Sequence, residues 1–407
     1  MLRIKRHKIH SAIAFVYVFF NALLLPFGLL YMHLLSPLFY GYLFIKKRGW
    51  VVFPLLLILL PFDIIHLVNG VDLSSFLVSN ALAISTFIVI STFAYGMRHF
   101  LNMHAIFKQV AMLNLALTII AIIVLFTDWK ESMWYLEKFT NNVSDFPRLK
   151  MLTYEASYYS LILAPVVIFH LLKVLLRQHK TNAIGLLVVV VVPLLLSFSV
   201  GALASIAFAF LTLFLMHWQK VFYNRGFFSF VMVSVAIVGL VALIALILFP
   251  QNAVLIRLEN IIGGTDSSML SRTKYAFITA GQVARERSIW FGAGLGQIKM
   301  LVPEIAEKYY GYKGDVGIVR IPNAIGETLA TFGIVGLAIR IGLIWFLYHW
   351  CKVRDNYFQT ILFVFIFIYQ FTGSFLVNMV EYVCWLFAFI RVFPEFDVPI
   401  TINSKSP

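Results

Sequence analysis

Residues 250–325 read PQNAVLIRLENIIGGTDSSMLSRTKYAFITAGQVARERSIWFGAGLGQIKMLVPEIAEKYYGYKGDVGIVRIPNAI. This stretch is the one long polar excursion in a chain of 407 residues that is 61% hydrophobic and only 12% charged. In soluble domains about half of the residues are apolar and about a quarter are charged, so this composition excludes a soluble protein. The chain is therefore a polytopic membrane protein, and we expect its chemistry in the long loop.

Stretches of about 20 mostly apolar residues, the length that a helix needs to cross a bilayer, recur along the whole chain. They predict an all-α polytopic membrane protein with about twelve transmembrane helices. Residues 11–45 also fit one span with a re-entrant piece, and residues 357–393 also fit one broken helix. The expected spans are 11–28, 30–45, 51–69, 74–96, 109–127, 155–176, 182–199, 201–218, 227–249, 326–350, 357–377 and 379–393.

The short turns between alternate spans are basic. Positive residues in short loops favour the cytoplasmic side, whereas charge in a long loop has little influence on orientation. Both chain ends are therefore expected inside and the long loop outside. The basic residues that set this orientation are Lys46, Lys47, Arg48, Arg98, Lys108, Lys173, Arg177, Lys180, Lys220, Arg225, Lys352 and Arg354.

The chain is expected to form a single membrane domain, 1–407, with two substantial outward segments, 128–154 and 250–325. About half of the net charge of +14 lies in the inside turns, beside anionic headgroups, so the charge does not indicate a nucleic-acid partner. Cys351 and Cys384 lie at or within spans, which argues against a disulfide framework. A site for an external or lipid-linked substrate would have to be built from the two outward segments.

The long loop itself is expected to be partly helical. After the Gly263–Gly264 turn, residues 271–290 have apolar residues at helical spacing and basic residues on the other face, which predicts an amphipathic helix on the membrane surface. Gly292, Gly294 and Gly296 then end this helix and permit close backbone approach. A second short helical piece follows before the span at 326.

Three carboxylates are candidates for a site, because charge in a span is costly. Glu155 opens the span 155–176, where it also suits the positive end of the helix dipole. Glu327 lies four residues after Asn323, so both project from one helix face, although Asn323 also fits an N-cap. Arg340 lies deeper in that span and fits a structural ion pair or a snorkelling side chain.

The last hairpin supplies Glu381, the third carboxylate. Together with Gln370, Ser374 and Asn378 it recurs at the spacing of one helical stripe in an apolar background. Such a stripe must face protein or water. It fits a functional site and interhelical hydrogen bonding equally well.

Arginines dominate the basic residues of the long loop. Their planar fork donates paired hydrogen bonds to phosphate, although a basic face touching anionic lipid is an alternative for each. The first outward segment adds Arg148, and Tyr158 and Tyr159 suit either a sugar-contacting patch or an aromatic belt. The loop has no His, no Cys and no close carboxylate pair, so we expect neither a metal nor a cofactor. The loop arginines singled out for phosphate are Arg272, Arg285, Arg287 and Arg320.

Four segments between about 145 and 345 resemble the bacterial O-antigen polymerase (Wzy) and O-antigen ligase superfamily. They are RLKMLTYEASYYS (148–160), LLLSFSVGALASI (194–206), SRTKYAFITAGQVARERSIWFGAGLGQ (271–297) and PNAIGETLATFGIVGLA (322–338). The last two are the more specific, and the order and spacing of all four carry the resemblance.

The resemblance implies a GT-C-like glycosyltransferase of the bacterial inner membrane, with its active site facing the periplasm. It would join undecaprenyl-pyrophosphate-linked glycans, as donor and acceptor, without a metal. It also implies membrane lipid and a polysaccharide chain-length regulator as partners. The roles that follow are pyrophosphate binding by Arg272, Arg285, Arg287 and Arg320, acceptor activation by Glu155, Glu327 and Glu381, and substrate binding by Arg148, Tyr158, Tyr159, Asn323 and Asn378.

One departure from the family pattern favours the polymerase. Ligases of the family usually have a His just before the Asn that aligns with Asn323, and this chain has Pro322 there. The alternatives are an O-antigen ligase that transfers polysaccharide to lipid A core, and a lipid-linked oligosaccharide flippase. A flippase is disfavoured because the chain shows no two comparable halves and its basic residues collect in one loop.

Overall fold

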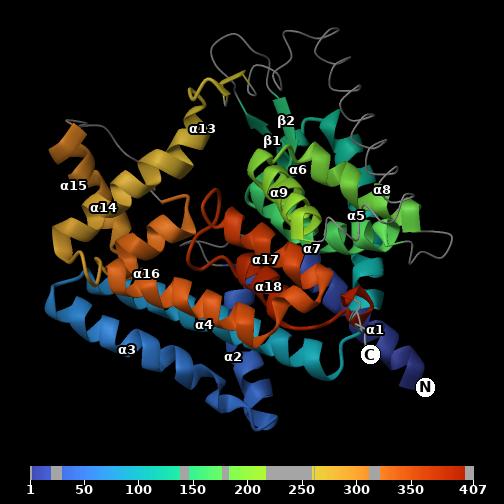
Figure 1. Cartoon of the computed structure of the whole chain (residues 1–407), viewed down its shortest axis with the longest axis horizontal. Helices are drawn as coiled ribbons and strands as arrows, with labels where there is room; N and C mark the ends of the chain where they lie inside the picture. The colour runs from blue at the N-terminus through green and yellow to red at the C-terminus, as the bar shows by residue number, and fades with distance from the viewer. Residues whose placement is uncertain are drawn as a thin grey trace, which may run out of the picture.

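The computed structural model describes residues 2–19, 30–137, 146–176, 183–216, 259–260, 262–310 and 321–398. Over these residues the protein is an all-α polytopic membrane protein, as predicted (Figure 1). The helices before the long loop are α1 (Leu2–Val18), α2 (Tyr31–Ile45), α3 (Phe53–Val68), α4 (Leu73–His99), α5 (Met103–Leu125), α6 (Lys130–Met133), α7 (Ala156–Leu175), α8 (Ala183–Leu196) and α9 (Val200–Met216). Those in and after it are α13 (Ser267–Leu270), α14 (Ala276–Arg287), α15 (Ile298–Tyr310), α16 (Ala324–Trp350), α17 (Tyr357–Tyr369) and α18 (Met379–Phe389).

Among the described residues, five helices are long and apolar enough to cross a membrane: Gly49–Val68, Leu73–His99, Met103–Leu125, Ala156–Leu175 and Ala324–Trp350. Shorter apolar helices occur in the predicted spans 11–28, 182–199, 201–218, 357–377 and 379–393, and α2 occupies the predicted span 30–45. The predicted span 227–249 lies outside those ranges. The total of twelve therefore stays a prediction.

The segment 128–154, predicted to face outward, contains a small antiparallel hairpin. Strand β1 (Trp134–Glu137) pairs with β2 (Phe146–Leu149), and Tyr135 stands opposite Arg148. The Trp134 indole donates to the carbonyl of Ala121 in α5 at 2.7 Å. This hydrogen bond attaches the hairpin to α5. In the sequence, β2 ends at Leu149, shortly before Glu155.

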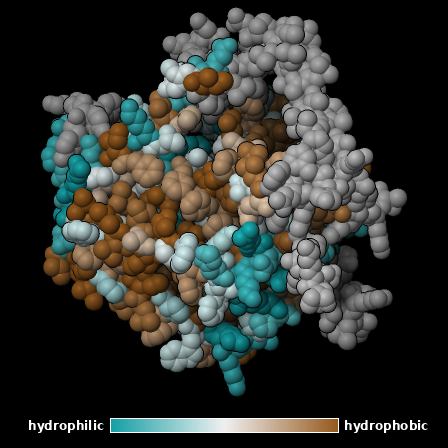
Figure 2. Space-filling model, viewed as in Figure 1, coloured by the Kyte–Doolittle hydropathy of each residue, from teal (hydrophilic) through white to brown (hydrophobic). Residues whose placement is uncertain are grey.

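The centre of the protein is α7, the most buried of the five candidate spans. It packs against α8, α9, α17 and α18. Aromatic rings fill the space beside it: Phe169 lies 5.4 Å from Phe107 and 4.5 Å from Phe393, measured between ring centroids. The outer helices α3 and α16 instead expose many large apolar side chains, and Figure 2 shows this apolar surface over the side of the molecule that carries them.

Helix α16 covers the predicted span 326–350, and it is broken at Gly333. Gly333 has φ 66° and ψ −164°, a conformation that is essentially confined to glycine. A contact between side chains on the two sides of the break confirms it: Arg340 Nη1 lies 3.2 Å from Thr328 Oγ1, although the two residues are 12 positions apart in the sequence. On a straight helix these two residues would be about 18 Å apart along the axis.

The glycine-rich end of the long loop closes this break. The N–H groups of Ala293 and Gly294 donate to the carbonyls of Ala330 and Thr331, each at 2.9 Å. On the other side of Gly333, the N–H groups of residues 334 and 335 donate to the carbonyls of residues 289 and 290, each at 3.0 Å. Backbone groups freed at a helix break must find partners when they are buried, and this loop supplies them.

The approach of the two backbones explains the glycines. A Cβ on Gly292 would stand 2.4 Å from the carbonyl carbon of Thr331, and one on Gly296 would stand 2.4 Å from the carbonyl oxygen of Ser75. Next to Gly296, the side chain of Gln297 bonds the backbone of Asp72: the Gln297 Oε1 accepts from the Asp72 N–H at 2.8 Å. Asp72 caps α4, and hydrogen bonds from the hydroxyl and the N–H of Ser75 hold the pKa of the Asp72 carboxyl below its ordinary value. The loop is thus tied to both α16 and α4.

The predicted surface helix begins with a π-helical turn, Ser271–Tyr275, and continues as α14. Its apolar stripe, Ala276, Ala280, Val283 and Ala284, is buried. Helices α14 and α16 lie side by side (Figure 1). Small residues permit this close contact, so the apolar stripe of α14 is covered by protein. Arg285 and Arg287 lie on its exposed side.

Candidate active site

The segment 370–378 joins α17 to α18, and several of the predicted site residues contact it. Helix α17 ends at Tyr369 and α18 begins at Met379. Gln370, Ser374, Asn378 and Glu381 therefore do not form one helical stripe, and that prediction is wrong. Asn378 instead caps α18 by accepting from the Val380 N–H at 3.2 Å, and its Nδ2 lies 3.2 Å from Ser374 Oγ.

Arg272 and Glu155 meet at one edge of this segment. The Arg272 Nη2 lies 3.1 Å from Glu155 Oε1, and its Nη1 donates to the Thr372 carbonyl at 3.3 Å. Both side chains are about a quarter exposed, at 24% for Arg272 and 26% for Glu155. Although Glu155 stands at the N-cap of α7, its side chain makes no capping hydrogen bond there. The dipole interpretation of Glu155 therefore does not describe its main contact, which is Arg272.

Asn323 fastens the backbone of Arg272 to the segment. Its Nδ2 donates to the carbonyl of Arg272 at 2.9 Å and to that of Phe371 at 2.8 Å. Its Oδ1 accepts from the Gly326 N–H at 2.9 Å, so Asn323 also caps α16. Asn323 is buried, and this arrangement holds the π-helical turn of Arg272 against the 370–378 segment. π-Helical turns are frequent at functional sites.

Glu327 lies one turn into α16 and is half-buried. Its Oε2 accepts from the N–H of Leu376 at 2.6 Å. The Leu376 carbonyl in turn accepts from the Tyr382 hydroxyl at 2.6 Å. Glu327 is therefore a second carboxylate beside the 370–378 segment. It accepts a hydrogen bond from the backbone of that segment, whereas Glu155 accepts one from Arg272.

A second arginine–glutamate pair lies deeper. Arg340 Nη2 is 2.6 Å from Glu381 Oε1 and 3.1 Å from Gln370 Oε1. Glu381 also accepts from the Trp385 indole at 3.2 Å and from the Ser374 hydroxyl. Its side chain is only 1% exposed, and that of Arg340 is 13% exposed. The predicted structural ion pair of Arg340 is thus found, with Glu381 as its partner.

The two predicted tyrosines separate. Tyr158 is half-buried, and its ring lies 6.0 Å from that of Tyr154 and 5.6 Å from that of Phe375, between centroids. Tyr159 is 1% exposed and donates to Asn114 Oδ1 at 2.6 Å inside the bundle. Consecutive helical residues point about 100° apart, so the two side chains cannot share one face.

The other predicted arginines are dispersed. Arg148 is 5% exposed and donates from Nε to the Ser197 carbonyl at 3.2 Å, below the hairpin. Arg285 and Arg287 are exposed on α14, and Arg287 donates to the Asn69 carbonyl at 3.4 Å. Arg320 lies outside the described residues. Of the arginines predicted to bind pyrophosphate, Arg272 is the one that bonds the 370–378 segment within the described ranges, and the deeper Arg340 bonds Gln370.

Sequence reasoning missed Thr372 and the backbone of residues 371 and 376, because backbone acceptors and donors leave no residue signature. Gly333, which lies in the quoted segment 322–338, was also not singled out from the sequence. A glycine between two apolar half-helices was the available signal for the break.

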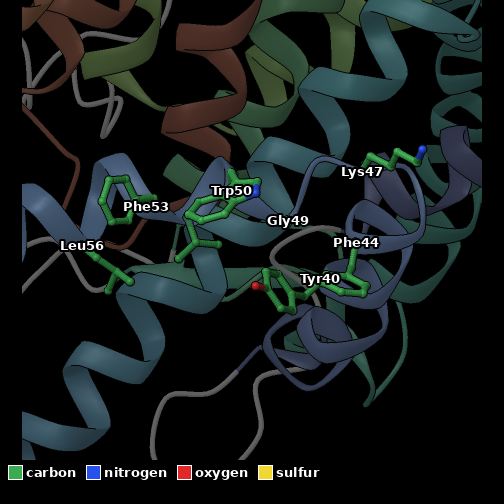
Figure 3. Close-up of a pocket in the computed structure, with 8 residues that line it drawn as sticks. Tyr40, Phe44, Lys47, Gly49, Trp50, Phe53 and Leu56 are labelled. Atoms are coloured by element: carbon green, nitrogen blue, oxygen red, sulfur yellow. The ribbon is translucent and has the colours of Figure 1, made fainter.

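No group of three or more His, Cys, Asp or Glu residues that could hold a metal occurs among the described residues. The pocket of about 600 Å³ in Figure 3 lies at the α2–α3 connection and is lined by Tyr40, Phe44, Lys47, Gly49, Trp50, Val52, Phe53 and Leu56. None of these residues belongs to the predicted site.

Residues 184–341 match a family model described as O-Antigen ligase. This range contains Arg272, Asn323, Glu327 and Arg340, and it ends before Glu381. No curated protein matches the chain. The match over residues 184–341 is consistent with the O-antigen polymerase/ligase superfamily that the sequence motifs resemble, and it supports a membrane enzyme of the glycosyl-transfer type.

Proposed function

We propose that the protein polymerises undecaprenyl-pyrophosphate-linked oligosaccharide repeat units into O-antigen or a related polysaccharide. The observation that carries this proposal is the contact of Arg272 with Glu155 at the edge of the 370–378 segment. It brings a phosphate-binding fork and a proton-accepting carboxylate to one partly exposed place. That is the pair of groups that glycosyl transfer from a pyrophosphate needs.

In the proposed reaction an acceptor sugar hydroxyl attacks the anomeric carbon of the donor. The new C–O bond forms as the bond from that carbon to the pyrophosphate oxygen breaks, and the configuration inverts. The pyrophosphate lipid leaves with the electron pair, and the hydroxyl proton passes to a carboxylate. The Arg272 guanidinium stabilises the negative charge that develops on the leaving oxygen.

The surroundings of the three carboxylates support different roles. Glu155 and Glu327 are partly accessible and border the same segment. Glu381 is enclosed by Arg340, Trp385 and Ser374. Glu381 is 1% exposed and held by three donors, so we assign Glu381 to holding the segment in place and the more accessible Glu155 or Glu327 to the acceptor hydroxyl.

Tyr158, with Tyr154 and Phe375 beside it, supports an acceptor-sugar contact next to Glu155. We propose that Asn323 acts by fixing Arg272, and Asn378 by ordering Ser374. The positive-inside pattern supports a site that faces the periplasm from the bacterial inner membrane. Arg285, Arg287 and Arg320 remain candidates for contacts with the lipid-linked donor or with anionic lipid, and Arg148 and Tyr159 act from inside the bundle. A chain-length regulator stays an implied partner with no assigned surface.

An O-antigen ligase is the second candidate, and the description of the matching family favours it. The ligase differs in its acceptor, which is lipid A core and not a second lipid-linked glycan. Pro322 argues against a ligase that uses a His before Asn323. A lipid-linked oligosaccharide flippase is the third candidate and would carry out no bond exchange.

The test is reconstitution of the full chain with a lipid-linked repeat unit as its only substrate. A ladder of glycans that is lost with Arg272→Ala supports the polymerase. Product that forms only after lipid A core is added supports the ligase. Transbilayer movement of the substrate without any new glycosidic bond would contradict both transferase assignments.

A further inference from the structure

Glu155 occupies the anion-binding side of Arg272. The guanidinium directs Nη2 to the Glu155 carboxylate and Nη1 to the Thr372 carbonyl. The first of these partners is an anion, and the second is a neutral acceptor fixed in the backbone. A phosphoryl oxygen that binds the Arg272 fork from this side must take the place of the Glu155 carboxylate.

The arrangement separates a fixed part of Arg272 from an exchangeable part. The Arg272 backbone is held by Asn323, which is completely buried. The side chain ends in a contact with about a quarter of each partner exposed. Because both side chains reach solvent, an incoming anion can approach Arg272 and exchange with the carboxylate.

A pyrophosphate diester has the advantage in that exchange. It carries two negative charges and several oxygen acceptors, whereas Glu155 carries one charge. The planar fork of arginine matches phosphate oxygens with two parallel hydrogen bonds. When Arg272 turns to the donor, Glu155 loses the positive charge that now neutralises it, and a carboxylate without such a partner is a better proton acceptor.

We propose that the donor pyrophosphate displaces Glu155 from Arg272, so that one binding event seats the leaving group and frees the carboxylate that accepts the acceptor's proton. This proposal rests on the proposed function. It makes Glu155 a competitor of the donor in the empty protein and a catalytic residue in the loaded one. No covalent bond changes in the exchange; the proton moves to Glu155 only during transfer.

The test is the affinity of the full-length protein in lipid nanodiscs for undecaprenyl pyrophosphate without a glycan. Glu155→Gln removes the competing charge with little change of shape. We expect it to bind the probe about three- to tenfold more tightly than the wild type, which corresponds to the loss of a partly exposed ion pair, while glycan ladder formation falls. Glu155→Ala should shift the affinity in the same direction, which keeps the test valid if one variant folds poorly.

Glu327→Gln is the matched control for affinity. It removes a carboxylate that borders the same segment but is bonded to the N–H of Leu376. Its affinity for the probe should remain within about twofold of the wild type. Equal tightening in both variants would show a general effect of net charge and would overturn the proposal.

The opposite outcome has a distinct meaning. If Glu155 merely orients Arg272, Glu155→Gln weakens binding of the probe, and the proposal is wrong while the polymerase can still stand. An unchanged affinity likewise overturns the exchange. If the wild type binds no pyrophosphate lipid and forms no ladder, the proposed function itself fails.

Discussion

Two arginine–glutamate pairs join the region around residues 370–381 to other parts of the protein, and they differ in burial. Arg272–Glu155 links the long loop to α7 with both side chains about a quarter exposed. Arg340–Glu381 links the second half of α16 to α18, with Glu381 only 1% exposed. Among the described residues, the Glu155 carboxylate accepts a hydrogen bond from Arg272, whereas the Glu381 carboxylate accepts from the side chains of Arg340, Ser374 and Trp385.

This difference separates an exchangeable pair from a structural one. A buried charge that loses its partner stays uncompensated in a medium of low dielectric constant, so the inner pair cannot open without a large cost. In the proposed exchange a phosphate ligand replaces Glu155 on Arg272, in the outer, Arg272–Glu155 pair, where both side chains reach solvent. Under the proposed function, the same residue types would serve substrate binding in one place and structural support in the other.

The largest effect on stability is expected from Arg340→Met. This change leaves the Glu381 carboxylate buried without its cation, and it should lower the free energy of unfolding by about 3–5 kcal/mol. Equilibrium unfolding in detergent measures it. The double variant Arg340→Met/Glu381→Met should recover most of that loss, because no charge is left unpaired. A single variant as stable as the wild type would contradict the structural role.

Arg272→Ala should instead act on catalysis. We expect the rate of glycan polymerisation to fall about 10²–10³-fold, the range for loss of one charge-stabilising donor in an active site. Unfolding should change by less than about 1 kcal/mol, because the pair is partly exposed. Lys274→Ala, two residues further in the same π-helical turn, is the matched control and should retain the ladder. A loss of folding comparable to that of Arg340→Met would remove the contrast between the pairs.

Gly333→Ala tests whether the helix break is what brings Arg340 to Glu381. The left-handed backbone alone should cost about 1–3 kcal/mol in an alanine variant. In addition, the new Cβ would stand 2.3 Å from the carbonyl carbon of Trp290. Gly342→Ala, in the same helix with open space around it, should be neutral or slightly stabilising. Equal unfolding free energies for the two variants would show that the break is dispensable.

The smallest effect is expected for the exposed arginines of α14. Arg285→Ala and Arg287→Ala should each change stability by no more than about 0.5 kcal/mol. Glycan ladders formed at low donor concentration measure their part in binding, with Arg272→Ala as the reference. A defect as large as that of Arg272→Ala would extend the donor-binding surface from the outer pair to α14.

Hydropathy alone identified the membrane class and the positions of most helices, because a bilayer-spanning helix must satisfy its backbone internally and expose apolar side chains. The sequence also identified Arg272, Glu155, Asn323 and Glu327 as candidates, since polar groups stand out in an apolar chain. It predicted a structural pair for Arg340 but could not name its partner.

The tertiary structure decided which of these residues meet. Arg272 and Glu155 are 117 residues apart, and local periodicity relates only residues three or four apart. It also decided that α16 breaks at Gly333 and that α17 ends at Tyr369. Backbone groups of the 289–294 loop and of the 370–378 segment form the hydrogen bonds that these interruptions leave open. A break in a buried helix is stable only where another part of the chain satisfies its open hydrogen bonds, and that partner is visible only once the chain is folded.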